Sequence, residues 1–156
     1  MKNKKKRFIG IFIIIIAMCN LWSLRPVKIL HVYSDFNSSV FVVVDHLPWA
    51  DSDKIGWFLS RREKLINDYP LIDGIPHSYY IMDVGEGFAN YKENPKEDLL
   101  CFSMGKKEHN CIIKNYPMVM SERPYENIHF QISSEWAVYN YELNPEGKIE
   151  YSHGER

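Results

Sequence analysis

An apolar run, Phe8–Leu24, limits most strongly what this chain of 156 residues can become. The run contains no charged residue, and five basic residues lie in the seven positions before it. As a helix that rises about 1.5 Å per residue it would span about 25 Å, slightly less than a hydrocarbon core of about 30 Å. Arg7 and Arg25 can close that gap by reaching the two surfaces, and Trp22 suits the outer interface. The run therefore predicts a membrane anchor, which Pro26 ends.

Two kinds of cleaved leader compete with an uncleaved anchor. A signal peptide usually has a shorter apolar region that ends in small residues. Ala17 and Cys19 come closest to such a cleavage site, but bulky residues continue the run through Leu24. The segment Ile16–Cys19 resembles a lipobox, except that Met18 stands where a small residue is normal. An uncleaved anchor is the preferred interpretation, and a mature protein that begins near Cys19 would contradict it.

Charge predicts the orientation of the anchor. The five basic residues before it outnumber Arg25 and Lys28 just after it, and the cytoplasmic flank of a membrane helix is the more basic one. Residues 1–7 are therefore expected to be a cytoplasmic basic tail, and residues 8–24 a single transmembrane anchor in the bacterial inner membrane. Residues 25–156 are expected to form a single periplasmic domain, which is long enough to bury one core.

Net charge restricts the partners of the part beyond the anchor. All 20 acidic residues but only 14 of the 19 basic residues follow the anchor, so this part carries a net charge of −6. Nucleic-acid binding would need clustered Lys and Arg, and an anionic membrane surface should repel this charge. The expected partners are the inner membrane, through the N-terminal helix, and a protein in the periplasm, but no nucleic acid.

Segments rich in β-branched and aromatic residues, separated by turn residues, predict several strands. The first two, Val27–Tyr33 and Ser39–Asp45, form a predicted hairpin. The remaining predicted strands are Ser78–Val84, Leu99–Met104, Cys111–Asn115, Ile128–Ser133, Trp136–Leu143 and Lys148–Tyr151. The predicted fold class is α+β: an N-terminal single transmembrane helix followed by a mostly antiparallel sheet with one packed amphipathic helix.

That helix is predicted to begin at Asp51 or Ser52, either of which can cap it, and to end before Pro70. Its apolar stripe at helical spacing, which Arg62 interrupts, consists of Ile55, Phe58, Leu59, Ile66 and Tyr69. Aromatic residues could line a binding groove near the helix, but filling the core is the preferred interpretation. These residues are Trp49, Trp57, Phe58, Tyr79, Tyr80 and Phe88.

Cys101 and Cys111 are the strongest chemical feature beyond the anchor. They lie on opposite arms of a predicted hairpin, in a compartment that permits disulfides. A bond would close a loop of about ten residues and stabilise the fold by roughly 2–3 kcal/mol. In this register Leu99 lies opposite Ile113, and side-chain alternation places both on one face with the two cysteines. We expect that face to be buried and Phe102 to point away from it, and two free thiols are the alternative.

No recognisable arrangement supports catalysis or metal binding, and no cofactor is expected. The histidines are scattered without a pair at ligand spacing, so structural or surface roles are preferred: His31, His46, His77, His109, His129 and His153. Asp83 and Glu86 are paired carboxylates, as in some hydrolases, but the adjacent glycines are also typical of a turn at a strand end. An enzyme would need both carboxylates in one cavity, with the pKa of at least one raised.

Several short motifs occur in the order of a known family. Leu24–Val27 follows the anchor directly, Leu47–Trp49 and Lys54–Phe58 mark the start of the helix, and Asp83–Phe88, Leu100–Phe102 and Cys111–Ile112 come later. In these motifs the chain resembles the enterobacterial family called domain of unknown function 943, whose members are described as membrane proteins. The resemblance implies a membrane anchor, but it implies no activity, cofactor or catalytic residue.

Size, topology and the lack of catalytic motifs favour non-enzymatic protein binding, as by an immunity protein that neutralises a periplasm-acting toxin. An envelope enzyme that uses Asp83 and Glu86 is the first alternative. A structural subunit of a membrane complex is the second, because the amide of Asn20 within lipid would prefer an interhelical hydrogen bond. The neighbouring genes would discriminate best, since a toxin gene beside this one would favour the immunity role.

Overall fold

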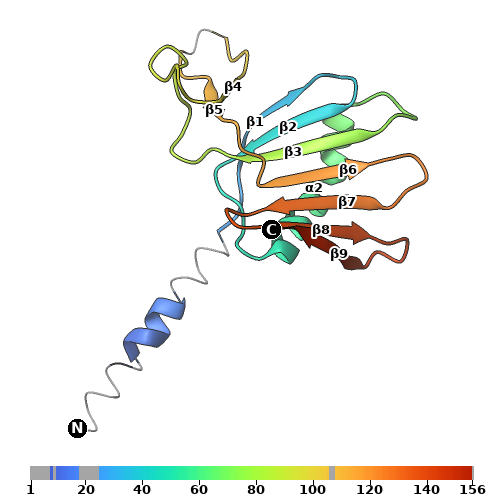
Figure 1. Ribbon diagram of the computed structural model, residues 1–156, viewed down its shortest axis with the longest axis horizontal. Helices are drawn as coiled ribbons and strands as arrows, with labels where there is room; N and C mark the ends of the chain where they lie inside the picture. Colours follow the sequence, from blue (N-terminus) through green and yellow to red (C-terminus); the bar gives the residue numbers. More distant parts are fainter. Residues whose placement is uncertain (1–7, 9, 18–24, 106–107, 156) are drawn as a thin grey trace.

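The computed structural model describes residues 8, 10–17, 25–105 and 108–155 (Figure 1). Residues 10–17 are helical, and Ile11–Ile16 expose between 46% and 65% of their surface. Within this described part of the chain, no helix combines the length and the apolar character needed to cross a membrane. The predicted anchor Phe8–Leu24 includes Ile9 and residues 18–24, which lie outside the described residues, as does the predicted basic tail.

Seven strands form one sheet, and two short strands form a separate hairpin. The spatial order in the sheet is β1-β2-β3-β6-β7-β8-β9, and the hairpin is β4-β5. In chain order the elements are β1 (Ile29–Ser34), β2 (Ser39–Val44), α2 (Asp51–Asp68), β3 (His77–Asp83), β4 (Leu99–Cys101), β5 (Cys111–Ile113), β6 (Met118–Glu122), β7 (Ile128–Ser133), β8 (Val138–Leu143) and β9 (Ile149–Glu155). All neighbouring strands except β2 and β3 are antiparallel, so the predicted α+β class and mostly antiparallel sheet are confirmed.

The connections between strands collect at two ends of the sheet. β2 and β3 are parallel because α2 carries the chain back across the sheet between them. We call the end where the chain enters β1 the proximal end, formed by residues 25–28, 45–50, 84–87, 114–117 and 134–137. The opposite end, the distal end, is formed by residues 35–38, 69–76, 123–127 and 144–148. In Figure 1 the proximal end lies on the left and the distal end on the right.

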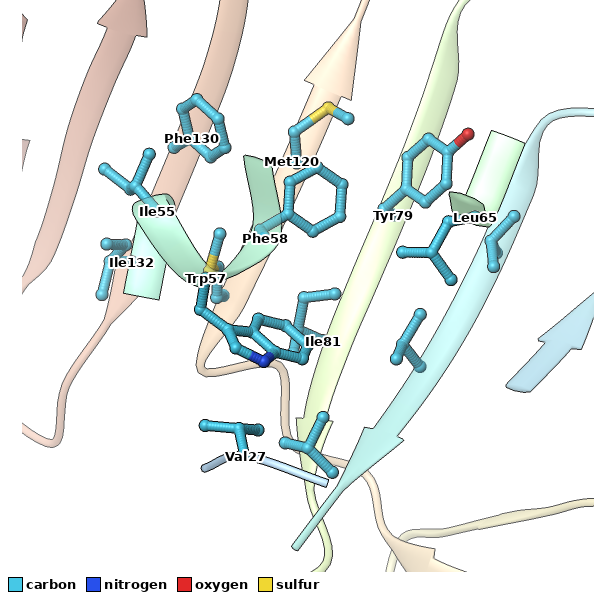
Figure 2. Packing of buried hydrophobic residues seen from close by; sticks show 14 residues of the cluster. Val27, Ile55, Trp57, Phe58, Leu65, Tyr79, Ile81, Met120, Phe130 and Ile132 are labelled. Carbon is cyan, nitrogen blue, oxygen red and sulfur yellow. The ribbon is translucent and has the colours of Figure 1, made fainter. Parts of the chain in front are cut away.

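Helix α2 covers one face of the sheet, and the main core lies between them (Figure 2). Phe58 is fully buried and packs edge-on against Tyr79 and Phe130, with ring centroids 5.5 and 6.2 Å away. The other buried members are Val27, Val40, Val42, Val44, Ile55, Trp57, Leu65, Ile81, Met118, Met120 and Ile132. Alternate residues of four central strands thus meet one helix, which explains why these strands and α2 form together.

Among the described residues, those that cover the opposite face of the sheet lie on one half of it. Residues 88–116, which we call the flap, contain β4 and β5 and pack against side chains of β1, β2 and β3 on this face. Phe102 and Ile112 of the flap are buried against Val43 and Met82 of the sheet. The half of this face on β6 to β9 carries polar side chains that are exposed or half-buried: Ser121, His129, Gln131, Ser133, Asn140 and Glu142.

The central strand β6 is absent from the sequence prediction. Its five residues, Met118–Glu122, follow Pro117 and precede Pro124, and methionine has no marked preference for strands. The pairing with β3 on one side and β7 on the other makes this segment a strand. Packing across the sheet, which the sequence alone does not display, decides the conformation here.

The predicted helix is present, but its start and its buried face differ in detail. α2 ends at Asp68, before Pro70, as predicted, but Ala50 occupies the position before it and no side chain caps the helix. Trp57 and Leu65 are buried although they lie outside the predicted stripe. Arg62, which interrupts the stripe, forms an ion pair with Glu122 of β6.

Candidate functional site

Asp83 and Glu86, the predicted carboxylate pair, line one cavity at the proximal end of β3. The cavity has a volume of about 670 Å³ and is also lined by Glu97 and by apolar residues of the flap. The Asp83 carboxylate accepts a hydrogen bond from the N–H of Gly85 at 2.8 Å, in a turn where Gly85 has a φ of 55°. That φ lies in the region that favours glycine. The cavity brings both carboxylates together, but Asp83 holds a turn and Glu86 is exposed.

Cys101 and Cys111 form a disulfide bond that joins β4 to β5. Their sulfur atoms are 2.02 Å apart, and Leu99 lies opposite Ile113, as in the register expected from the sequence. The expected buried face is wrong in part, because Cys111 is buried but Ile113 is 60% exposed, whereas Phe102 is buried on the other face. The flap meets the sheet through the face opposite the disulfide, where Val43 and Met82 provide the apolar surface for Phe102 and Ile112.

Three polar side chains form a row across the open half of the sheet. Ser121 lies opposite His129, and His129 lies opposite Glu142, with 3.6 Å between His129 Nδ1 and Glu142 Oε1. The order serine, histidine, carboxylate is that of a nucleophilic triad. Within the described residues, however, no hydrogen bond joins Ser121 to His129, and the row is half-exposed on an open face. These features favour a solvated sheet face over an activated nucleophile.

Metal binding finds no support in the described part of the chain. No group of three or more His, Cys, Asp or Glu residues there could hold a metal ion. His46 contacts Asp45 and the Arg25 carbonyl oxygen, and His77 contacts the Ile72 carbonyl oxygen, so these two rings have structural partners.

Two aromatic side chains project from the distal end. Phe36, between β1 and β2, is 65% exposed, and Tyr125, between β6 and β7, is fully exposed at 107%. Their φ angles are 54° and 66°, in the left-handed region that costs a residue with a Cβ roughly 1–2 kcal/mol. The two turns are about three strand spacings apart, or roughly 15 Å. Both rings therefore fit within the roughly 800 Å² that one partner contributes to a typical protein interface.

Asp35 holds the turn that carries Phe36. One Asp35 carboxylate oxygen accepts the backbone N–H groups of residues 37–39 at 2.8 to 2.9 Å, and Ser34 Oγ accepts the Phe36 N–H at 2.9 Å. Partial burial alone would raise the pKa of Asp35, but these backbone donors outweigh it and hold the pKa below its ordinary value. The turn is thus organised by its own side chains to keep Phe36 in its exposed position.

Asp45 has the corresponding role at the proximal end, but two of its partners, Arg25 and Lys28, are distant in sequence. Its carboxylate lies 2.6 Å from Arg25 Nη2, accepts the Lys28 N–H at 2.8 Å, and lies 2.8 Å from His46 Nδ1. Partial burial alone would raise the pKa of Asp45, but the Lys28 N–H, Arg25 and His46 together lower it. Asp45 therefore ties the segment where the chain enters the sheet to the connection that leads into α2.

Two exposed tryptophans project from the same proximal end. Trp49, in the connection between β2 and α2, is 63% exposed, and Trp136, in the turn between β7 and β8, is 83% exposed. The Tyr141 hydroxyl of β8 donates a hydrogen bond to Asp51 at 2.9 Å, which places the start of α2, and with it Trp49, beside β8. The expectation that Trp49 fills the core is wrong, because the chain turns into α2 with this side chain pointing outward.

Sequence reasoning missed both pairs of exposed aromatics, although one local signal was present at each distal turn. Asp35 precedes Asn37 and Ser38, a composition typical of turns closed by an aspartate side chain. Pro124 precedes Tyr125, and the Glu126 N–H bonds the Arg123 carbonyl oxygen at 3.2 Å. A proline in the second position of such a turn permits a positive φ in the third. The sequence carries no comparable signal for the exposure of Trp49 or Trp136.

The fold and the two ends of its sheet define an α+β protein with an apolar N-terminal helix and a flap that a disulfide bond braces. The family model described as “Enterobacterial putative membrane protein (DUF943)” matches residues 1–152, so the chain belongs to this family, as its motifs indicated. No curated protein and no solved structure matches the chain.

Proposed function

We propose that this protein crosses the bacterial inner membrane once and that its C-terminal part binds a protein partner in the periplasm without catalysing a reaction. In this proposal residues 1–7 lie in the cytoplasm, residues 8–24 cross the membrane, and residues 25–156 form a single periplasmic domain. The family description as membrane proteins supports the anchor. So does the helix at residues 10–17, which exposes apolar side chains all round. The Cys101–Cys111 bond is typical of an oxidising compartment.

The observation that carries the binding role is the pair of exposed aromatic rings on left-handed backbone, Phe36 and Tyr125. Glycine or asparagine would satisfy both turns at lower conformational cost. Strained backbone of this kind is concentrated at functional sites, and exposed aromatic rings are the side chains that dominate protein interfaces. Because the two rings lie at the end of the sheet remote from Arg25, the anchor leaves them accessible to a partner in the periplasm.

The partner class that best suits a small, anchored, acidic domain is a toxin that acts in the periplasm, which would make this chain an immunity protein. The net charge of −6 beyond the anchor favours a basic toxin through long-range attraction. Deleting the gene should then sensitise cells to neighbouring strains or to a toxin encoded beside it. If deletion never sensitises cells in either way, the immunity role is refuted.

The binding surface is tested by restoring the deleted gene with variants. Phe36→Gly and Tyr125→Gly should abolish protection while the protein accumulates normally, because glycine suits both backbone conformations. Tyr91→Gly is the matched control, since Tyr91 is 59% exposed on the flap, and it should protect like the wild type. Full protection by the double variant Phe36→Gly and Tyr125→Gly would contradict the assignment of the distal end.

The orientation is tested by fusions after Arg156. A reporter active only in the periplasm should be active there, and a reporter active only in the cytoplasm should be silent. The reverse result would overturn the orientation and remove the reason for the disulfide. A mature protein that begins near Cys19 would show instead that the apolar run is a cleaved leader.

An envelope enzyme is the second candidate, favoured by the shared cavity of Asp83 and Glu86. The substitutions Asp83→Asn and Glu86→Gln separate it from the binding role, because Asn can still accept the Gly85 N–H and keep the turn. The binding role predicts that both variants protect like the wild type. Loss of protection in either variant, with normal accumulation, would favour the enzyme. A structural subunit that assembles through Asn20 would be excluded if Asn20→Leu left every detergent-stable oligomer unchanged.

A further inference from the structure

We propose that the proximal end of the sheet rests on the lipid bilayer, with Trp49 and Trp136 in the headgroup layer. The inference rests on the proposed anchor and adds a second membrane contact that fixes how the periplasmic part stands on the membrane. The occupant of this surface is the same phospholipid bilayer that residues 8–24 cross.

No long linker separates the predicted anchor from the sheet. β1 begins at Ile29, and Val27 is already buried in the main core with 8% of its surface exposed. Arg25 is held by Asp45 at 2.6 Å, and its carbonyl oxygen lies 3.2 Å from His46 Nε2. The first residue after the anchor is thus fastened to the sheet, so the proximal end stays at the membrane surface.

The two exposed tryptophans lie at the same end of the sheet as Arg25. Trp49 follows Asp45 by four residues, which limits their Cα separation to about 14 Å. Trp136 lies two residues before β8, and the Tyr141–Asp51 hydrogen bond joins β8 to the start of α2 beside Trp49. Both indoles therefore project from the end of the sheet that Arg25 holds at the bilayer.

The exposed side chains at the proximal end are of the type that membranes hold in their headgroup layer. The chain has four tryptophans, of which Trp57 is buried in the core and Trp22 lies in the predicted anchor. The remaining two are the exposed pair at the proximal end, whereas the exposed rings of the distal turns belong to Phe36 and Tyr125. Indoles, with an apolar body and one N–H donor, are enriched in the headgroup layer of membranes.

Charge indicates which lipids this surface prefers. The part beyond the anchor carries a net charge of −6, and acidic residues such as Asp53 and Glu135 lie close to the tryptophans in sequence. The proximal end itself is balanced, with Arg25, Lys28 and Lys114 against Asp45, Glu86 and Glu135, so the net charge decides and zwitterionic headgroups suit the contact better than anionic ones. Strands of six residues, at about 3.3 Å each, then hold the distal turns roughly 20 Å further from the membrane.

The test uses the full-length protein in vesicles of phosphatidylcholine whose acyl chains carry bromine near the headgroups, which quenches nearby indoles. Combinations of Trp22→Phe, Trp49→Phe and Trp136→Phe leave one of these tryptophans beside the buried Trp57. Emission from Trp49 and from Trp136 should fall about twofold relative to unbrominated vesicles, as expected for interfacial indoles. A variant that retains Trp57 alone supplies the background and should not be quenched.

Two outcomes separate the contact from the anchor on which it rests. If Trp22 is quenched but neither Trp49 nor Trp136 is, the anchor stands and the bilayer contact is refuted, which would leave the proximal tryptophans to a protein partner. If Trp22 is not quenched either, the proposed anchor fails and the contact fails with it.

Lipid charge gives a second, independent readout. Replacing part of the phosphatidylcholine with phosphatidylglycerol should weaken quenching of Trp49 and Trp136, and added salt should restore it, because salt screens the repulsion. Stronger quenching in anionic vesicles would show that basic residues make the contact, and it would overturn the role assigned to the tryptophans.

Discussion

The two ends of the sheet are each fastened by one aspartate, but the fastenings differ in reach. Asp35 at the distal end accepts the backbone N–H groups of residues 37–39, which lie two to four positions further along the chain. Asp45 at the proximal end binds the Arg25 side chain and the Lys28 N–H, which lie 20 and 17 positions away in sequence. The distal aspartate organises one turn, whereas the proximal one joins two separate segments of the chain.

This difference suits the roles that we propose for the two ends. A turn organised by its own residues can display a ring to a partner without changing the rest of the fold. The contacts of Asp45 join residues 25–28 to the connection that leads into α2. They therefore hold the start of the sheet in a fixed position relative to the proposed anchor. The predictions below separate the two fastenings by the size and the spread of their effects.

Asp45→Ala should cause the largest loss in the free energy of unfolding. It removes the carboxylate that pairs with the half-exposed Arg25 and accepts the Lys28 N–H, and we expect the free energy of unfolding to fall by about 2–3 kcal/mol. Urea unfolding of the full-length protein in detergent measures this. Asp68→Ala is the matched control, because it removes only an exposed ion pair with Lys64 and should cost less than about 1 kcal/mol. Equal losses of the free energy of unfolding in the two variants would show that Asp45 does not join the two segments of the chain.

Asp35→Ala should cost less and act locally. A side chain that caps backbone N–H groups contributes typically about 1 kcal/mol, so we expect a loss of about 1–2 kcal/mol. Hydrogen exchange should speed up at residues 36–39 and stay unchanged at residues 25–28. Faster exchange at both ends would show that the distal fastening is not local.

Acid should weaken both fastenings. The pKa of each carboxyl is lower in the folded protein than its ordinary value of 3.8, so its stabilising contribution is complete above that value. The contribution disappears as the pH falls through the lowered folded pKa. The urea concentration at the unfolding midpoint of the wild type should therefore fall when the pH is lowered below about 4. In Asp35→Asn or Asp45→Asn this fall should be smaller, because Asn does not titrate. An unchanged pH profile in both variants would contradict these assignments.

Phe36→Gly should have the smallest effect on the free energy of unfolding, and the sign of that effect is informative. Relief of the left-handed backbone at Phe36 opposes the entropy that glycine adds to the unfolded chain, so stability should stay level or rise by up to about 1 kcal/mol. Tyr91→Gly lacks the relief, because Tyr91 has no positive φ, and should lose about 0.5–1 kcal/mol. Thermal unfolding of the two variants compares them directly, and a larger loss for Phe36→Gly would show that the ring is needed for folding.

Much of the fold could be predicted because its signals are local. The hairpin around Asp35, the helix that ends before Pro70 and the register of Cys101 with Cys111 all follow from turn residues, periodicity or spacing within short segments. The α+β class follows from the order of these elements.

The parts that could not be predicted depend on contacts between distant segments. Met118–Glu122 becomes a strand through partners on both sides, and the flap turns Phe102 inward because the sheet offers an uncovered apolar face there. The candidate surfaces depend on exposure, which a sequence does not display, and this is why the sequence favours the core for Trp49. Asp83 and Glu86 do line one cavity, which is only the geometric part of what the enzyme hypothesis requires.

One measurement tests the proposed division of roles between the two ends most directly. A photo-crosslinking amino acid is placed at position 49, 136, 36 or 125 of the full-length protein, with position 91 as the control, in native enterobacterial cells. The account predicts lipid adducts from positions 49 and 136, and a single protein adduct shared by positions 36 and 125 but not formed at 91. Lipid adducts from positions 36 and 125, or the same protein adduct from both ends, would contradict it.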